Sequence, residues 1–139
     1  MKRDINDYFR EITQNMYTQV ENKLSKYGIV KGQAQLLLLI KDNDGCSQKE
    51  LANYFNIKYS SMSQRLSRLE DLGYITRMHE DNNFKYNKIY ITKEGKQAAI
   101  QCRRILNDIE KSVFKGLSKK DLTMFENMLV SMIENLENV

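Results

Sequence analysis

The chain has 139 residues, of which 41% are hydrophobic and 29% are charged. This composition excludes a chain that is disordered throughout, because disorder combines low hydrophobicity with high net charge. The longest apolar run, residues 36–40, is much shorter than the roughly 20 residues that cross a bilayer. The N-terminal residues do not resemble a signal peptide, so we expect one cytoplasmic subunit with no membrane contact.

The positive charge of the chain is concentrated in its middle third. The formal net charge is +4 and the pI is about 9.0. Residues 46–93 hold 8 basic and 5 acidic residues, whereas residues 1–45 hold 7 and 6, and residues 94–139 hold 7 of each. This distribution favours a nucleic-acid-binding centre flanked by oligomerising ends.

The spacing of apolar residues predicts two helices in the first third. A stripe that recurs every three or four residues predicts a long helix over about residues 5–27, with Gly28 as its left-handed cap. A second helix is expected over residues 31–41. Because it is apolar on nearly all sides, it should be deeply buried.

The next segment has the spacing of a helix-turn-helix. Ser47 and Glu50 form the pattern of a capping box and predict a short helix. A further helix is expected over residues 59–72, after a tight connector. The small side chain of Ala52 lets the two helices cross closely, and Ile57 fills the turn between them.

Alternating apolar residues then predict a β-hairpin. Residues 74–78 and 88–91 are the expected strands, joined by a polar turn at residues 80–83. Thr92 and Ser118 are the expected caps of two further long helices. This order predicts a mainly α fold with a small β-hairpin wing, that is, a winged helix-turn-helix with long terminal helices. The apolar faces of those helices are too wide for so small a module to cover, so we expect a homodimer.

The helix at residues 59–72 has the composition of a DNA recognition helix. Met62, Leu66 and Leu69 lie within about 60° of arc and predict its buried face. The opposite face carries serines that allow close approach, a glutamine that can read adenine, and arginines that can read guanine or hold phosphate. The predicted DNA-binding residues of this helix are Ser60, Ser61, Ser63, Gln64, Arg65, Ser67 and Arg68. Further DNA contacts are predicted from the wing and its flanks, at Ser47, Gln48, Arg77, Asn83 and Lys85.

Other chemistry has little support in the sequence. No nucleophile elbow, phosphate loop or paired histidine and carboxylate is present, so we expect no enzyme activity and no cofactor. His79 lacks partners at metal-ligand spacing, so no metal site is expected. Cys102 lies on an apolar stripe and Cys46 precedes a helix cap, and both are interpreted as packed thiols.

Three segments together resemble the MarR family of bacterial regulators. They are Leu69–Arg77 (LEDLGYITR), Ile91–Gly95 (ITKEG) and residues 28–37, and the resemblance extends over essentially the whole chain. It implies a dimeric repressor that binds an inverted repeat in double-stranded DNA. It also implies dimerisation helices at residues 1–30 and 94–139 around a DNA-binding lobe at residues 31–93.

The wing departs from the pattern of that family, which places an arginine after an aspartate. Residues 81–85 offer Lys85 instead, which lacks the planar fork of arginine. A phosphate contact from the wing is expected, while its readout of the minor groove is left open.

The resemblance further implies a pocket for a small amphipathic effector between the dimer helices and the DNA-binding lobe. The candidate pocket residues are Tyr8, Met16, Tyr17 and Tyr27. Two alternatives of the same fold stay open, namely a thiol-redox-responsive regulator and a winged helix that binds protein rather than DNA.

Overall fold

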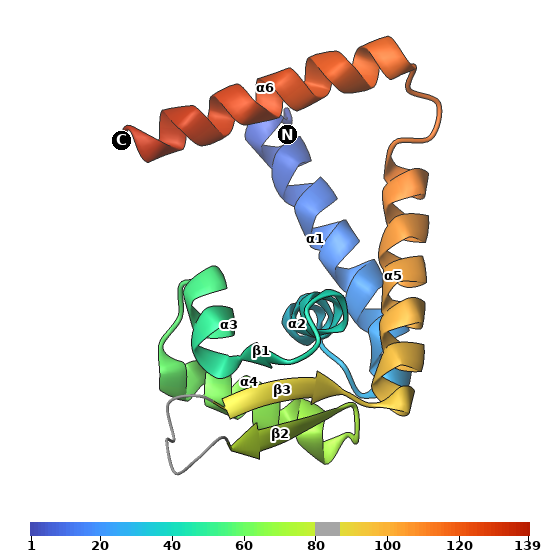
Figure 1. The fold of residues 1–139 in the computed structure, drawn as a ribbon. Helices are drawn as coiled ribbons and strands as arrows, with labels where there is room; N and C mark the ends of the chain where they lie inside the picture. The colour runs from blue at the N-terminus through green and yellow to red at the C-terminus, as the bar shows by residue number, and fades with distance from the viewer. Residues whose placement is uncertain (80–86) are drawn as a thin grey trace. The chain divides into compact units, whose positions relative to one another are not determined.

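The computed structural model describes residues 1–79 and 87–139, which form six α-helices, one short 3-10 helix and three strands (Figure 1). In chain order the elements are α1 (Ile5–Leu24), η1 (Ser25–Tyr27), α2 (Lys31–Asp42), β1 (Cys46–Ser47), α3 (Gln48–Tyr54), α4 (Tyr59–Asp71), β2 (Ile75–His79), β3 (Asn87–Ile91), α5 (Lys93–Val113) and α6 (Lys119–Glu137). The predicted fold class, mainly α with a winged helix-turn-helix, is confirmed. The predicted turn at residues 80–83 lies outside the described residues.

The chain divides into two compact units, residues 1–107 and residues 108–139. The first unit contains the helix-turn-helix and the sheet, and the second contains α6. None of the helices in the described part of the chain has the length and hydropathy of a membrane span.

The first unit is built around α2, which packs against α1, α4 and β3. Its residues Leu36, Leu37 and Ile40 are almost completely buried, as the apolar run in the sequence predicts. The sheet is antiparallel with the order β1-β3-β2, so the central strand β3 pairs with both of its neighbours. Ile89 of β3 lies opposite Cys46 on one side and Arg77 on the other.

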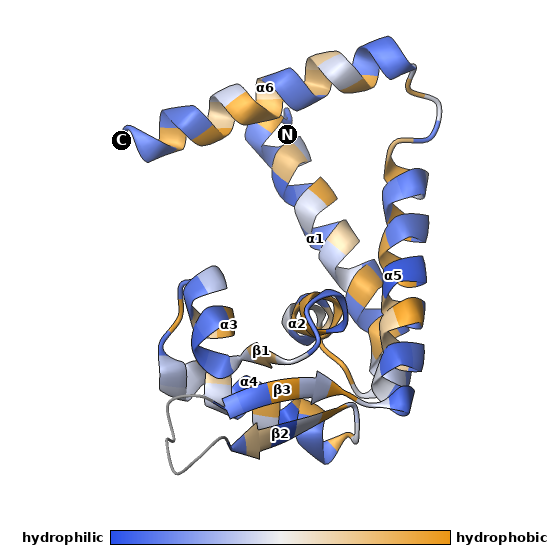
Figure 2. Cartoon of the chain, in the orientation of Figure 1, coloured by the Kyte–Doolittle hydropathy of each residue, from blue (hydrophilic) through white to orange (hydrophobic). Residues whose placement is uncertain are grey.

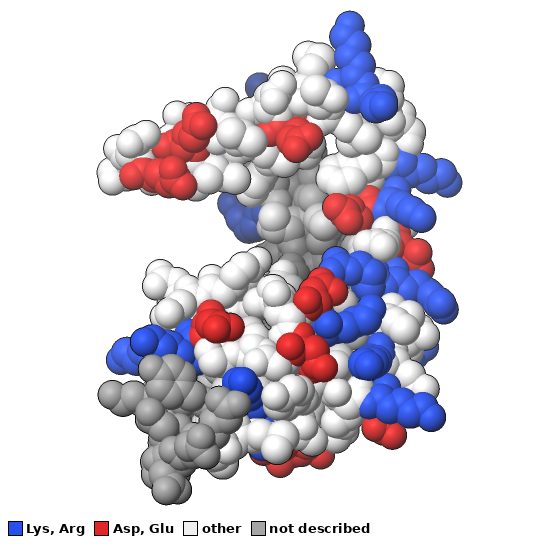
Figure 3. All heavy atoms as spheres, in the orientation of Figure 1, with Lys and Arg blue, Asp and Glu red and all other residues white. Residues whose placement is uncertain are grey.

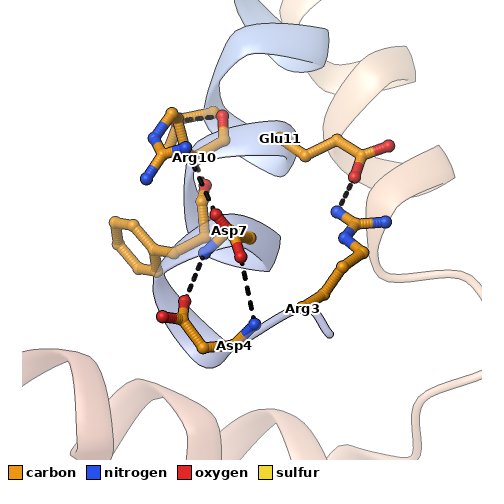
Figure 4. Close-up of polar contacts among 7 residues, drawn as sticks. Arg3, Asp4, Asp7, Arg10 and Glu11 are labelled. Carbon is orange, nitrogen blue, oxygen red and sulfur yellow. Dashed lines mark hydrogen bonds and ion pairs between the residues drawn. The ribbon is translucent and has the colours of Figure 1, made fainter. Parts of the chain in front are cut away.

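Local hydrogen bonds set where the long first helix begins. Asp4 accepts from the backbone of Asp7 at 3.0 Å, and Asp7 accepts from the backbone of Asp4 at 3.1 Å, which completes a capping box (Figure 4). Asp7 also pairs with Arg10 at 3.3 Å, and Arg3 pairs with Glu11. The first turns of α1 are therefore stabilised by their own polar contacts, without burial.

The ends of α1 and α5 show close backbone constraints. The α-helix α1 ends three residues earlier than predicted, because residues 25–27 tighten into η1 before Gly28 reverses the chain at φ 70°.

At the start of α5, a Cβ on Gly95 would lie 2.8 Å from Ile91 Cγ1 and would clash with the carbonyl oxygen of Tyr74. Only glycine allows α5 to pack this closely against the chain before β2.

Two helices leave large apolar side chains exposed. In the first half of α1, Ile5 is 76% exposed and Phe9 and Ile12 are about half exposed. Helix α6 has no buried residue, and Leu136 is 75% exposed. Figure 2 shows apolar residues recurring along both helices. Exposed apolar residues that recur along a helix are typical of interaction surfaces.

Candidate nucleic-acid interface

The rotation of α4 about its own axis is set by three buried side chains. Met62, Leu66 and Leu69 are each 0% exposed, and together they form the inner face of the helix. The opposite face is therefore directed to solvent. The exposed residues predicted to bind DNA on this face are Ser60, Ser61, Gln64, Arg65 and Arg68.

The two arginines and the glutamine of this face border a small cavity. Gln64, Arg65 and Arg68 line a space of about 260 Å³ together with the N-terminus of α2. Among the described residues, none of these three side chains has a hydrogen-bond or ion-pair partner within the chain. Their donors are therefore available to an external acceptor such as a phosphate or a base edge.

The structure differs from the sequence interpretation at Arg77, Ser63 and Ser67. The Arg77 guanidinium, 15% exposed, donates to the Ser67 hydroxyl at 2.7 Å and to the Ser63 hydroxyl at 3.2 Å. It also pairs with Glu70 at 3.2 Å. The two serines therefore lie on the flank of α4 that faces β2, where they bind Arg77. An arginine with this many partners inside the chain holds the sheet to α4, and its predicted phosphate contact stays a prediction.

The side chains of the predicted flank residues Ser47 and Gln48 also form hydrogen bonds within the chain. The Ser47 hydroxyl accepts from the backbone of Glu50 at 3.1 Å and caps α3, as the capping-box pattern predicts. Gln48 is 0% exposed, because the first turn of α3 packs against the sheet and the start of α4. Its side chain is therefore not accessible to DNA, which corrects the prediction. Asn83 and Lys85 lie outside the described residues.

Positive charge alone does not mark the interface. Lysines and arginines also gather along α5, as Figure 3 shows on one face of the molecule. Exposed members of this group are Lys93, Lys96, Arg103 and Arg104. The outer face of α4 differs because it combines arginines with a glutamine and small hydroxyl side chains, which supply both charge and hydrogen-bonding groups for base edges.

Sequence analysis missed one polar residue at the base of the wing. Asn87 begins β3 and is 8% exposed, on the same buried side of the strand as Ile89 and Ile91. The signal was present, since a polar residue at an inward position of an alternating strand breaks the pattern. Its partners lie 28 and 39 residues away in the chain and could not be inferred from spacing.

Both thiols are protonated at neutral pH. Burial raises the pKa of Cys46 to about 11, and burial likewise raises the pKa of Cys102 to about 11. At pH 7 about one thiol in ten thousand is then ionised, and the thiolate is the reactive form. No cluster of residues able to hold a metal ion occurs in the described part of the chain.

The four predicted pocket residues are not brought together within one chain. Tyr8 and Tyr17 are about half exposed on α1, and Tyr8 lies against the Arg3 guanidinium at 4.4 Å. Tyr27 instead borders an open cavity of about 590 Å³ between η1, the residue before β2 and the start of α5. Burial raises the pKa of Tyr74, another residue of this cavity, and its hydroxyl donates to the Tyr27 carbonyl at 2.9 Å. The remaining lining residues are Glu94, Gln97, Ala98 and Gln101.

Comparison with known sequences agrees with this arrangement. The MarR family model matches residues 27–82, which contain α2, α3, α4 and β2. A similar protein of Bacillus subtilis, named as the uncharacterized HTH-type transcriptional regulator YybA, is 23% identical over 96% of this chain and 91% of its own length.

Solved structures share the fold over nearly the whole chain. A DNA complex of S. aureus MepR has a TM-score of 0.78 at 22% identity, covering 96% of both chains. A Listeria monocytogenes protein, described as a putative MarR family transcriptional regulator and complexed with a 26mer DNA, has a TM-score of 0.76 at 23% identity. It covers 99% of this chain and 91% of its own. The predicted resemblance is thus confirmed: residues 27–82 match the MarR family, and the chain has the winged-helix fold of that family's regulators.

Proposed function

We propose that the protein is a transcriptional regulator that binds a specific sequence of double-stranded DNA through the outer face of α4. The observation that carries this proposal is the exposure of Gln64, Arg65 and Arg68 on one face, with no polar partner within the described chain. A glutamine can read adenine through two hydrogen bonds, and an arginine can read guanine or hold a phosphate. Two structural relatives are themselves described as DNA complexes.

The DNA-binding proposal is tested by selecting duplexes from a random pool and measuring affinity for the best sequence. Gln64→Ala should weaken that affinity by about 1–3 kcal/mol and relax the preference at one position in each half-site. Arg68→Ala should lower the affinity for all DNA sequences alike. It should also reduce the slope of log affinity against log salt concentration by about one. Gln35→Ala is the matched control, because Gln35 is exposed on α2 away from this face.

The protein-binding alternative predicts a different result. Affinity for random duplex DNA would then be weak at all salt concentrations and would not fall steeply as salt rises. An unchanged selected sequence for Gln64→Ala would contradict the assignment of the reading face.

We further propose that the protein acts as a homodimer on an inverted repeat, in the arrangement of dimerisation helices at residues 1–30 and 94–139 around a DNA-binding lobe at residues 31–93. The exposed apolar side chains of α1 and α6 support this proposal, because a second copy would remove both faces from water. Two recognition helices related by a two-fold axis would enter major grooves about 10–10.5 base pairs apart.

The dimer proposal is tested by placing a charge on the apolar face of α6. Met132→Lys introduces a cation twice at a two-fold interface, so it should shift the mass in sedimentation from dimer to monomer and abolish binding to the selected duplex. Glu134→Lys, on the polar side of α6, makes the matched control and should remain dimeric. A wild-type monomer at micromolar concentration that binds the duplex fully would contradict the proposal.

We propose that a small amphipathic molecule, and not thiol oxidation, releases the protein from DNA as a repressor. The cavity bordered by Tyr27 and Tyr74 offers aromatic surface and amide groups for such a molecule. Both thiols are poorly suited to sensing because burial raises the pKa of each. A differential affinity of about 1.4 kcal/mol between two dimer geometries would change DNA binding tenfold.

Release from the selected duplex distinguishes regulation by a small molecule from regulation by thiol oxidation. We expect at least one compound in a panel of phenols and aromatic carboxylates to release the wild type, and peroxide to have no effect. The double variant Cys46→Ser with Cys102→Ala should respond as the wild type does. Release by peroxide in the wild type alone, with no active compound in the panel, would instead establish thiol sensing.

A further inference from the structure

A polar cluster joins the first residues of α3, α4 and β3, which are Gln48, Tyr59 and Asn87; Gln48 and Asn87 are buried, and Tyr59 is 38% exposed. The Gln48 amide donates to the Tyr59 carbonyl oxygen at 3.3 Å. The Asn87 amide donates to Gln48 Oε1 at 3.4 Å and to the Tyr59 hydroxyl at 3.3 Å. Tyr59 is therefore held both by its backbone and by the end of its side chain. We call these three residues the Asn87 cluster.

The Asn87 cluster places polar side chains where apolar ones would make the folded state more stable. Gln48 is 0% exposed and Asn87 is 8% exposed. Within the described residues, Asn87 Oδ1 has no hydrogen-bond partner. A buried polar atom without a partner lowers stability, and an apolar side chain like those of Ile89 and Ile91 would avoid this loss. Stability alone therefore does not account for an asparagine at this position.

The start of α4 is the part of the fold that depends on this cluster. Helices α1, α3 and α6 each begin with a side chain, Asp4, Ser47 or Ser118, that caps the first turn. The residue in the same position before α4, Lys58, makes no such bond. The Asn87 cluster thus provides side-chain hydrogen bonds to the first turn where a cap is missing, immediately before the exposed Ser60 and Ser61.

We propose that the Asn87 cluster is a positioning device that sets the place of the first turn of α4 relative to strand β3 of the wing. This inference rests on the DNA-binding function proposed above, because the distance between α4 and the wing decides which groups reach the DNA together. Hydrogen bonds to base edges require accurate placement of side chains, whereas attraction to phosphates tolerates small displacements. Loss of the cluster therefore reduces specific binding more than non-specific binding.

The test compares two variants with matched controls. Asn87→Ala removes both amide bonds, and Tyr59→Phe removes only the hydroxyl that accepts from Asn87. The controls are Asn53→Ala and Tyr54→Phe, which alter the same residue types on the exposed side of α3. Each protein is titrated with the selected duplex and with a scrambled duplex of equal length at one salt concentration, below its unfolding transition.

We expect each cluster variant to bind the selected duplex about tenfold more weakly, and the scrambled duplex less than twofold more weakly. In the background of Asn87→Ala, Tyr59→Phe should have a smaller effect than in the wild type, because the bond between Asn87 and the Tyr59 hydroxyl is already lost. A direct contact of the Tyr59 hydroxyl with DNA would make the two effects additive and would overturn the proposal. Equal losses on both duplexes would also overturn it.

Amide hydrogen exchange gives a readout that needs no DNA. The amide of Met62 donates to the Lys58 carbonyl at 3.0 Å and closes the first turn of α4. We expect faster exchange at this amide in Asn87→Ala and in Tyr59→Phe, and unchanged exchange in the controls. Unchanged exchange in both cluster variants would overturn the positioning role.

The two proposals can fail separately. A wild type that prefers no duplex would refute the proposed function, and exchange at Met62 would then decide the role of the cluster. Tyr59→Phe loses one oxygen at a partly exposed site, so it keeps the fold even if Asn87→Ala does not. In that case Asn87→Ser replaces Asn87→Ala in the comparison.

Discussion

The burial of Met62, Leu66 and Leu69 is the constraint on which the candidate interface depends. All three side chains are 0% exposed, and a buried side chain of this size contributes roughly 1.5–3 kcal/mol. Because the three lie on one face of α4, their burial fixes which residues point outward. A rotation by one residue, about 100°, would expose part of the apolar face. It would bury Arg65 and Arg68 in one direction, or Ser63 and Glu70 in the other. The hydrophobic core therefore determines the composition of the surface offered to a partner.

Polar contacts between α4 and the sheet fix the position of α4 along its own axis, which the apolar packing alone does not. The Arg77 guanidinium reaches Ser63, Ser67 and Glu70 across successive turns of α4. Apolar contacts alone permit sliding, whereas hydrogen bonds of defined geometry select one position along the helix. The sheet, α3 and α4 consequently form one unit whose outer surface has a fixed arrangement.

The helices were predictable because their signals are local. Apolar residues at intervals of three or four residues, together with the cap at Ser118 and the reversal at Gly28, located the helix ends to within a few residues. The inner face of α4 was predictable for the same reason, since it follows from helix geometry alone.

The role of flanking polar residues was not predictable in the same way. Arg77 and Gln48 look like surface residues in the sequence, and Asn87 lies just before the strand expected at residues 88–91. All three bind partners within the fold. Their partners are 10, 11 and 39 residues distant in the chain, so tertiary packing decides their environment. A basic residue near a recognition helix can therefore be part of the scaffold instead of the binding surface.

The most direct test of the central claim uses the arginine side chains as reporters. In NMR spectra of the Nε–Hε groups, titration with the selected duplex should shift Arg65 and Arg68, which are exposed on the outer face of α4. The signal of Arg77 should stay in place, because its guanidinium is bound to α4 in the free protein. A shift of Arg77 with no change at Arg65 and Arg68 would contradict the proposal that the outer face of α4 contacts DNA.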